Sequence, residues 1–290
     1  MKLRCVLLAL CFGFFVSYPV QAQEASEDAD QAFEEFMKKS ELEVGPLTGR
    51  MSKVAEINTP EGYMFSGPKG TQYLMELMGN PVDGSEIGFV SPDNYFESDD
   101  GWFLVFEFNE VGYVKDDEKD SLDADAMLKS IRDNEQSSND YRQAQGYSTL
   151  HVQRWAVSPN YNSETQNLEW ALEFEVRPEM DRIVNHNIKI LGRNGYVQAT
   201  LVCGPEQLQS VLPEAREILR GFTYQSGQKY AEYRKGDKIA EYGLTGLVVG
   251  GGLALAAKSG LLGRLLKPLI IGVLAFGAFI KKIFTGKNGR

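Results

Sequence analysis

Residues that could support redox or metal chemistry are scarce in this sequence. Its 290 residues include three cysteines and two histidines. Cys5 and Cys11 lie in an N-terminal segment that we expect to be cleaved, which leaves Cys203 as the only thiol and permits no internal disulfide. His151 and His186 have no cysteine nearby and do not form a structural zinc site. We therefore expect no metal and no cofactor, and a fold that rests on an ordinary apolar core with a small buried thiol.

Motifs for catalysis are also missing. The sequence contains no G-x-S-x-G or H-E-x-x-H motif, so an enzyme would lack an obvious candidate nucleophile or metal site. Glu169, Glu173 and Glu175 share one strand face beside Trp170, which is more typical of a solvated face than of a sugar-cleaving pair. We expect a protein that is not an enzyme, with a hydrolase as the last alternative.

Basic residues are few in the main part of the chain. Residues 23–240 contain 21 basic and 39 acidic residues. Binding to nucleic acid depends on phosphate contacts from Lys and Arg. We therefore expect no nucleic-acid partner, and a charged surface of this kind keeps an exported domain soluble.

The N-terminus has the pattern of a secretory signal peptide. Two cations precede the apolar run from Cys5 to Val16, and Val20 and Ala22 are spaced like a cleavage site. The apolar run is shorter than the roughly 20 residues that a membrane span needs. We predict a signal peptide over residues 1–22 and export of the main domain to the periplasm of a bacterium.

The segment DKIAEYGLTGLVVGGG, residues 237–252, suggests either a phosphate-binding loop or a helix buried in lipid. Its glycines lack the G-x-G-x-x-G spacing, and the nearest P-loop match has Ala257 where the second glycine should stand. We therefore expect no nucleotide. The stretch from Tyr242 to Leu262 carries one charge, Lys258, and is long enough to cross a bilayer.

The C-terminus thus predicts a membrane anchor with three parts: a transmembrane helix at 239–262, a second transmembrane or interfacial helix at 265–284, and a basic tail at 285–290. The number of membrane spans stays open. Two spans would return the C-terminal lysines to the periplasm, against the rule that basic residues stay on the cytoplasmic side, so the second helix is either a span or lies at the interface. Small residues recur along the first helix at Gly246, Gly250, Gly252 and Ala256 and form a groove for another helix. The expected partners are the lipid bilayer and a protein, or a second copy of the chain, bound through this groove.

Between the two ends, residues 45–238 predict a periplasmic α+β domain. Residues 23–44 are an acidic arm, either mobile or docked as a first helix. One helix is expected at 70–79, with Tyr73, Leu74, Leu77 and Met78 on its buried face, and a second from Asp123 to about Gln145. A strand pair is expected at 101–114. Further strands are expected at 147–157, 168–176 and 182–203, the last with a hairpin turn at Asn194-Gly195. The fold class is α+β: an antiparallel sheet domain flanked by helices, followed by a C-terminal transmembrane helical hairpin.

The acidic run from Asp116 to Asp125 raises a question of calcium binding. Its spacing does not follow the EF-hand pattern. Local helix chemistry explains part of it, because Asp123 is placed as an N-cap and Leu122 can pack on Met127. Calcium binding stays open at this point.

Several stretches resemble a bacterial membrane-anchored family, the domain of unknown function 2167. They are GWFLVFEFNEVGYVKDDEKDSLDADAML, VQRWAVSPNYNSETQNLEWAL, VNHNIKILGRNGY and DKIAEYGLTGLVVGG. The resemblance covers roughly residues 45–284 and implies an exported domain with a C-terminal anchor in the cytoplasmic membrane. It implies no activity and no catalytic residue. Among the matching positions, Arg154, Tyr161 and Arg193 are our candidates for ligand or partner contacts.

These observations predict a membrane-anchored envelope protein that works through protein contacts or as a scaffold. The alternative is a periplasmic module that binds or senses a ligand. A ligand-binding module would bring polar groups together near the three candidate residues, whereas an interaction module would show an exposed apolar or charged patch.

Overall fold

The computed structural model describes residues 31–96, 98 and 101–250. The predicted signal peptide at 1–22, the first part of the acidic arm, the helix at 265–284 and the tail at 285–290 lie outside the described residues. Within the arm, residues 31–40 form a helix whose Phe36 is buried, which matches the docked alternative.

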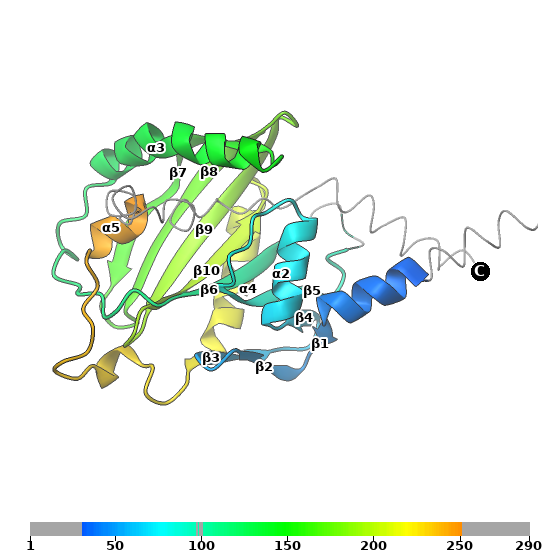
Figure 1. The fold of residues 1–290 in the computed structure, drawn as a ribbon, viewed down its shortest axis with the longest axis horizontal. Helices are drawn as coiled ribbons and strands as arrows, with labels where there is room; N and C mark the ends of the chain where they lie inside the picture. Colours follow the sequence, from blue (N-terminus) through cyan, green and yellow to red (C-terminus); the bar gives the residue numbers. More distant parts are fainter. Residues whose placement is uncertain (1–30, 97, 99–100, 251–290) are drawn as a thin grey trace, which may run out of the picture.

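Eight strands form one antiparallel sheet, in the order β1-β4-β5-β6-β10-β9-β8-β7 (Figure 1). Their bounds are Glu43–Val44 for β1, Tyr63–Ser66 for β4, Glu86–Pro92 for β5, Phe103–Asn109 for β6, Tyr196–Cys203 for β10, Asp181–Leu191 for β9, Asn167–Arg177 for β8 and Thr149–Asn162 for β7. The expected α+β fold with an antiparallel sheet and flanking helices is confirmed.

A smaller sheet and five helical segments complete the described fold. The small sheet has the order β11-β3-β2, with bounds Phe222–Tyr224, Ala55–Thr59 and Leu47–Met51. The remaining helices are α2 at Pro68–Leu77, α3 at Ala124–Ala144, α4 at Leu208–Arg220, a short η1 at Tyr230–Glu232 and α5 at Leu244–Val249. Figure 1 shows α2, α3 and α5 on one side of the large sheet and α4 on the other.

Alternation along β10 explains why both faces of the sheet are covered. Val197 and Ala199 point into a core shared with α4 and the small sheet. Tyr196 and Val202 point the other way, into the cores beneath α3 with α5 and beneath α2 respectively. Cys203 lies in the α4 core, where burial raises the pKa of its thiol to about 12. It is therefore the small buried thiol that we expected.

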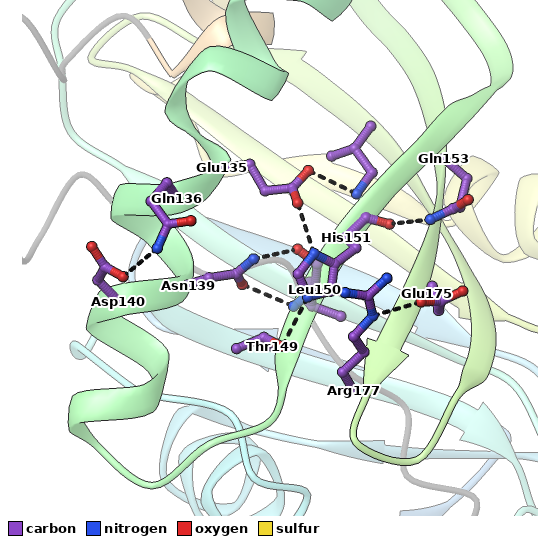
Figure 2. A network of polar contacts seen from close by, with 11 residues as sticks. Glu135, Gln136, Asn139, Asp140, Thr149, Leu150, His151, Gln153, Glu175 and Arg177 are labelled. Carbon is purple, nitrogen blue, oxygen red and sulfur yellow. Dashed lines mark hydrogen bonds and ion pairs between the residues drawn. The ribbon is translucent and has the colours of Figure 1, made fainter.

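The outer edge of β7 is bound by polar side chains of α3 rather than by another strand (Figure 2). The side chain of Asn139 donates to the carbonyl of Leu150 at 2.9 Å and accepts from its N–H at 2.8 Å. Glu135 accepts the N–H of Val152 at 3.0 Å. Arg132 and Arg142 donate to the carbonyls of Gln153 and Ser148.

These four α3 residues have helical spacing and form one face of the helix. They satisfy main-chain groups that an edge strand otherwise leaves open to another chain. His151 is part of the same contact, because its Nδ1 lies 2.9 Å from Glu135 and its Nε2 lies 3.0 Å from the hydroxyl of Thr149.

Local signals in the sequence were mostly correct. The side chain of Asp123 caps α3 by accepting from the N–H of Ala126 at 3.0 Å, and β9 and β10 form the hairpin expected at Asn194-Gly195. The strand pair expected at 101–114 is wrong, because β6 is a single strand and Tyr113 pairs with Ile239 instead.

The expected buried face of α2 is also partly wrong. Leu74 and Met78 are buried as predicted, whereas Leu77 is 37% exposed and Met75 is buried in its place. Met75 and Met78 lie three positions apart and so share one side of the helix. The observed buried face is therefore rotated slightly about the helix axis from the predicted face.

None of the helices in the described ranges is long and apolar enough to cross a membrane. The described part of the predicted span at 239–262 contains the bridge at Ile239 and the six-residue α5. The rest of that span lies outside the described residues, and the predicted anchor stays a prediction.

We expect Asn139→Ala to destabilise the protein, because it leaves the N–H and carbonyl of Leu150 unpaired at a buried position. The loss in the free energy of unfolding should be about 1–3 kcal/mol, measured by urea denaturation. The matched control is Gln136→Ala on the exposed side of the same helix, where the side chain of Gln136 donates to Asp140. It should change stability by less than about 0.5 kcal/mol, and equal effects at both positions would contradict this role of Asn139.

Candidate functional site

The three candidate contact residues lie on different parts of the sheet. Arg154 on β7 is 65% exposed at its side chain, and its Nη2 lies 2.6 Å from Oε2 of Glu173 on β8. Arg182 on β9 also pairs with Glu173, which is fully buried. The expectation of a solvated glutamate face is therefore wrong at Glu173, because two arginines from neighbouring strands cover its carboxylate.

The same face continues toward α4. Arg216 donates to Glu169 at 3.1 Å, and Nε2 of the fully buried His186 lies 3.6 Å from the same carboxylate oxygen. His186 and Arg216 hold the pKa of the Glu169 carboxyl below its usual value. This glutamate is therefore the ion-pair partner of Arg216.

Tyr161 lies toward the far end of β7. Its hydroxyl donates to Asp116 at 3.2 Å. Burial, and then the charge of Asp116, raise the pKa of Tyr161. The first residue of the acidic run thus has a structural partner.

Other members of the acidic run also have partners within the fold. Glu118 accepts the N–H of Thr245 at 2.7 Å, and Asp123 caps α3. No group of three or more His, Cys, Asp or Glu residues in the described part of the chain is arranged to hold a metal ion.

Arg193 lies at the tip of the β9–β10 hairpin and makes a bidentate ion pair. Its Nε and Nη2 bind the two carboxylate oxygens of Asp237 at 2.7 and 2.8 Å. The same carboxylate accepts the N–H of Arg234 at 2.7 Å. Hydrogen bonds from Arg193 and then Arg234 lower the pKa of Asp237 to about 2.

This ion pair fastens residues 228–250, which we call the C-terminal segment, to the end of the sheet. The main chain of Arg193 donates to the carbonyl of Gln228 at 2.8 Å. Tyr113 donates its N–H to Lys238 at 2.8 Å and accepts from Ala240 at 2.9 Å. The segment is thus bound at several points before it reaches α5.

Helix α5 is packed into the domain. Leu244, Leu247 and Val248 are buried in the core beneath α3. Lys189 on β9 donates to the carbonyl of Leu247 at 2.9 Å. The position of α5 is therefore set by apolar burial together with a hydrogen bond from a buried ammonium.

Two of the four predicted helix-packing residues lie in this segment. At Gly246 a side chain would come within 2.7 Å of Cβ of Tyr242. Gly250 ends α5 in the left-handed conformation, with φ of 77°. Gly252 and Ala256 lie outside the described residues, and packing of these four residues in a membrane stays a prediction.

Lys189 also belongs to a buried polar cluster in the middle of the sheet, between the cores beneath α2 and α3. Four of its members are cross-strand neighbours on β5, β6, β10 and β9: Glu86, Glu107, the half-buried Gln198 and Lys189. Thr200 on β10 and Asn187 and Asn185 on β9 adjoin them and are buried. Gln198 donates to Glu107 and to Thr200, each at 3.1 Å. Thr200 donates to Asn187 at 3.2 Å.

Two charged groups of the cluster, the ammonium of Lys189 and the carboxyl of Glu86, are affected by burial and by their neighbours. The ammonium of Lys189 donates to the hydroxyl of Tyr196 at 3.2 Å and lies over the rings of Tyr196 and Trp170, 4.3 and 5.4 Å from their centroids. Burial raises the pKa of Glu86, and the nearby charge of Glu107 acts in the same direction.

Asn185 is the exception in the cluster. It is fully buried, and neither its Nδ2 nor its Oδ1 has a hydrogen-bond partner in the described part of the chain. An unpaired buried amide costs about 1–3 kcal/mol. Asn185 therefore has hydrogen-bonding capacity that a water or a small polar molecule would use.

Sequence reasoning missed Asp237, Lys189 and Asn185. A signal for two of them exists in VNHNIKIL, where alternate residues place Asn185, Asn187 and Lys189 on one strand face. Nothing in the spacing shows that Asp237 meets Arg193, because 44 residues separate them.

We expect the ion pair between Arg193 and Asp237 to make stability depend on pH. The pKa of Asp237 is lowered from 3.8 to about 2, so the pair contributes fully above pH 3.8 and its contribution is lost as the pH falls through about 2. The melting temperature of Asp237→Asn should lie below that of the wild type at pH 7, and the difference should shrink between pH 4 and pH 2. Glu217→Gln, which breaks an exposed pair with Arg220, is the control and should show no such trend.

We expect Asn185→Leu to stabilise the protein by about 1 kcal/mol, because it removes an unpaired buried amide with a side chain of similar size. The matched control is Asn187→Leu on the same face, which breaks the hydrogen bonds with Thr200 and with the carbonyl of Asn185 and should destabilise by about 1–2 kcal/mol. Urea denaturation measures both. A loss of stability at position 185 equal to that at 187 would show that the amide is already satisfied.

Comparisons with known proteins give a family but no activity. No curated protein matches the chain. Among solved structures, the solution structure of cyanobacterial PsbP (CyanoP) from Synechocystis sp. PCC 6803 is similar at 12% identity and a TM-score of 0.36, covering 63% of this chain and 92% of that chain. A family model described as "Protein of unknown function (DUF2167)" matches residues 46–280. The chain therefore belongs to the DUF2167 family.

Proposed function

We propose that this protein is a non-enzymatic interaction module of the bacterial envelope, in which an exported α+β domain is held on a C-terminal membrane anchor. The observation that carries the proposal is the binding of the C-terminal segment to the domain. The bidentate pair between Arg193 and Asp237 and the burial of α5 fix the chain up to residue 250. With the first residues of the predicted anchor at 239–262 fixed in this way, the rest of the anchor would hold the domain in a set orientation, unlike a flexible tether.

The candidate contact residues support interaction over small-molecule binding at their own positions. Arg154, Tyr161 and Arg193 each contact a carboxylate within the domain, namely Glu173, Asp116 and Asp237. Their polar groups are engaged at three separate places and do not converge on one ligand. In this proposal their role is to hold the domain in shape for a partner that binds elsewhere on its surface.

A ligand-binding module is the second candidate, and the unpaired amide of Asn185 favours it. The buried polar cluster around Asn185 offers both hydrogen-bond donors and acceptors. A small polar molecule bound there would raise the melting temperature, because the free energy of unfolding increases with the logarithm of the ligand concentration above Kd. Native mass spectrometry of the purified full-length protein would detect such a molecule if it co-purifies.

The anchor is tested with the full-length protein in bacterial membranes. We expect it to stay in the membrane pellet after an alkaline carbonate wash, and an alkaline phosphatase reporter joined after Gly250 to be active outside the cytoplasm. Release of the protein by carbonate would contradict the proposal, and so would a reporter that is inactive because it stays in the cytoplasm.

The interaction is tested by crosslinking in intact cells followed by identification of the captured proteins. We expect a specific partner with the wild type, and reduced capture with Asp237→Asn, which loosens the C-terminal segment but leaves the anchor sequence unchanged. Glu217→Gln on α4 is the control and should capture as much as the wild type. Capture of no partner together with a co-purified small molecule would favour the second candidate.

A further inference from the structure

Residues 229–239, which we call the basic loop, form an exposed cationic and aromatic surface on an otherwise acidic domain. Its four basic residues are all exposed: Lys229, Arg234, Lys235 and Lys238. Tyr233 and Ile239 are 39% and 37% exposed and are among the few large apolar side chains on the described surface. The loop therefore combines positive charge with apolar groups that water solvates poorly.

The two acids in the loop offset only part of this charge, because Asp237 is neutralised by Arg193 and Glu232 leaves the loop with an excess of cations. One oxygen of Glu232 accepts the N–H groups of Gly227 and Lys229, each at 2.8 Å. Asp237 binds Arg193 with both of its oxygens. Both carboxylates are turned to partners within the domain, while the cations face solvent.

The loop is held in a defined shape. The ring of Tyr113 lies 4.4 Å from that of Tyr230 and 4.3 Å from that of Tyr233, measured between centroids. Main-chain bonds between Tyr113 and the segment at Lys238 and Ala240 hold its other end. Figure 1 shows this part of the chain projecting beyond the end of the large sheet, on the same side of the molecule as α5.

We propose that the basic loop binds the anionic headgroups of a lipid bilayer. Tyr and an aliphatic side chain beside Lys and Arg form the combination that lies at membrane interfaces, where rings enter the headgroup region and cations meet lipid phosphates. The loop ends at Ile239, where the predicted transmembrane helix at 239–262 begins. This inference rests on the proposed function, because it assumes that the anchor brings the membrane to this end of the domain.

The loop also resolves an electrostatic conflict. The exported domain as a whole is acidic and would be repelled by anionic lipid. A cationic surface on the segment that leads into the predicted anchor would turn this end toward the headgroups and the acidic remainder away from them. The domain would then present a constant face to proteins in the periplasm.

The test uses the full-length protein reconstituted in vesicles of neutral phosphatidylcholine, with or without phosphatidylglycerol, that contain a trace of lipid with a photoreactive headgroup. After illumination, mass spectrometry locates the crosslinked peptides. We expect crosslinks to concentrate in residues 229–239 in the anionic vesicles, with at least roughly a fivefold lower yield in neutral vesicles or in high salt.

Two charge-reversal variants with the same change in net charge complete the test. Arg234→Glu/Lys238→Glu should reduce crosslinking of the loop by roughly tenfold or more. Lys69→Glu/Arg220→Glu, at exposed positions on α2 and α4, should leave it unchanged.

Protein that stays in the vesicles after a carbonate wash but shows equal crosslinking of the loop and of α2 would overturn this inference and leave the anchor intact. Protein that washes off would instead contradict the proposed function. A third outcome would also overturn the lipid assignment. If the loop crosslinks are lost only when an acidic peptide is added, and not in neutral vesicles, the partner is an anionic protein.

Discussion

The bidentate ion pair between Arg193 and Asp237 fixes the start of the C-terminal segment, residues 228–250, against the end of the large sheet. It joins a hairpin tip to a residue 44 positions later, with both guanidinium–carboxylate bonds shorter than 3 Å. From that point the chain runs past Tyr113 and into α5, whose apolar residues complete the core beneath α3. The pair holds the basic loop against the hairpin tip, while apolar burial and the hydrogen bond from Lys189 set the position of α5.

The same region connects the surface of the protein with its interior. Lys189 belongs to the buried polar cluster, yet it donates to a main-chain carbonyl of α5. A buried ammonium without that carbonyl would lose much of its compensation for desolvation. Polar groups in the sheet and the packing of the C-terminal segment are therefore energetically coupled, and this coupling gives α5 a preferred position that apolar contacts alone would specify less sharply.

Features with a local cause were predictable from the sequence, and those that depend on distant contacts were not. The cap at Asp123 and the turn at Asn194-Gly195 follow from short-range chemistry. Alternation in β8 predicted which glutamates share a face, but it could not show that Arg154 and Arg182 would cover Glu173. The contact of Lys189 with α5 uses a carbonyl oxygen, which every residue has, so no sequence pattern marks it.

The attachment of α3 to β7 has a consequence for how the chain can change in length. The side chains of Arg132, Glu135, Asn139 and Arg142 reach main-chain groups of β7 and of Ser148 just before it only because they share one helical face. Inserting or deleting one residue between them would rotate part of that face by about 100° and remove several bonds together. Family members should therefore vary in length before Ala124 or in the turn near Gly146, while the stretch in between keeps a constant number of residues.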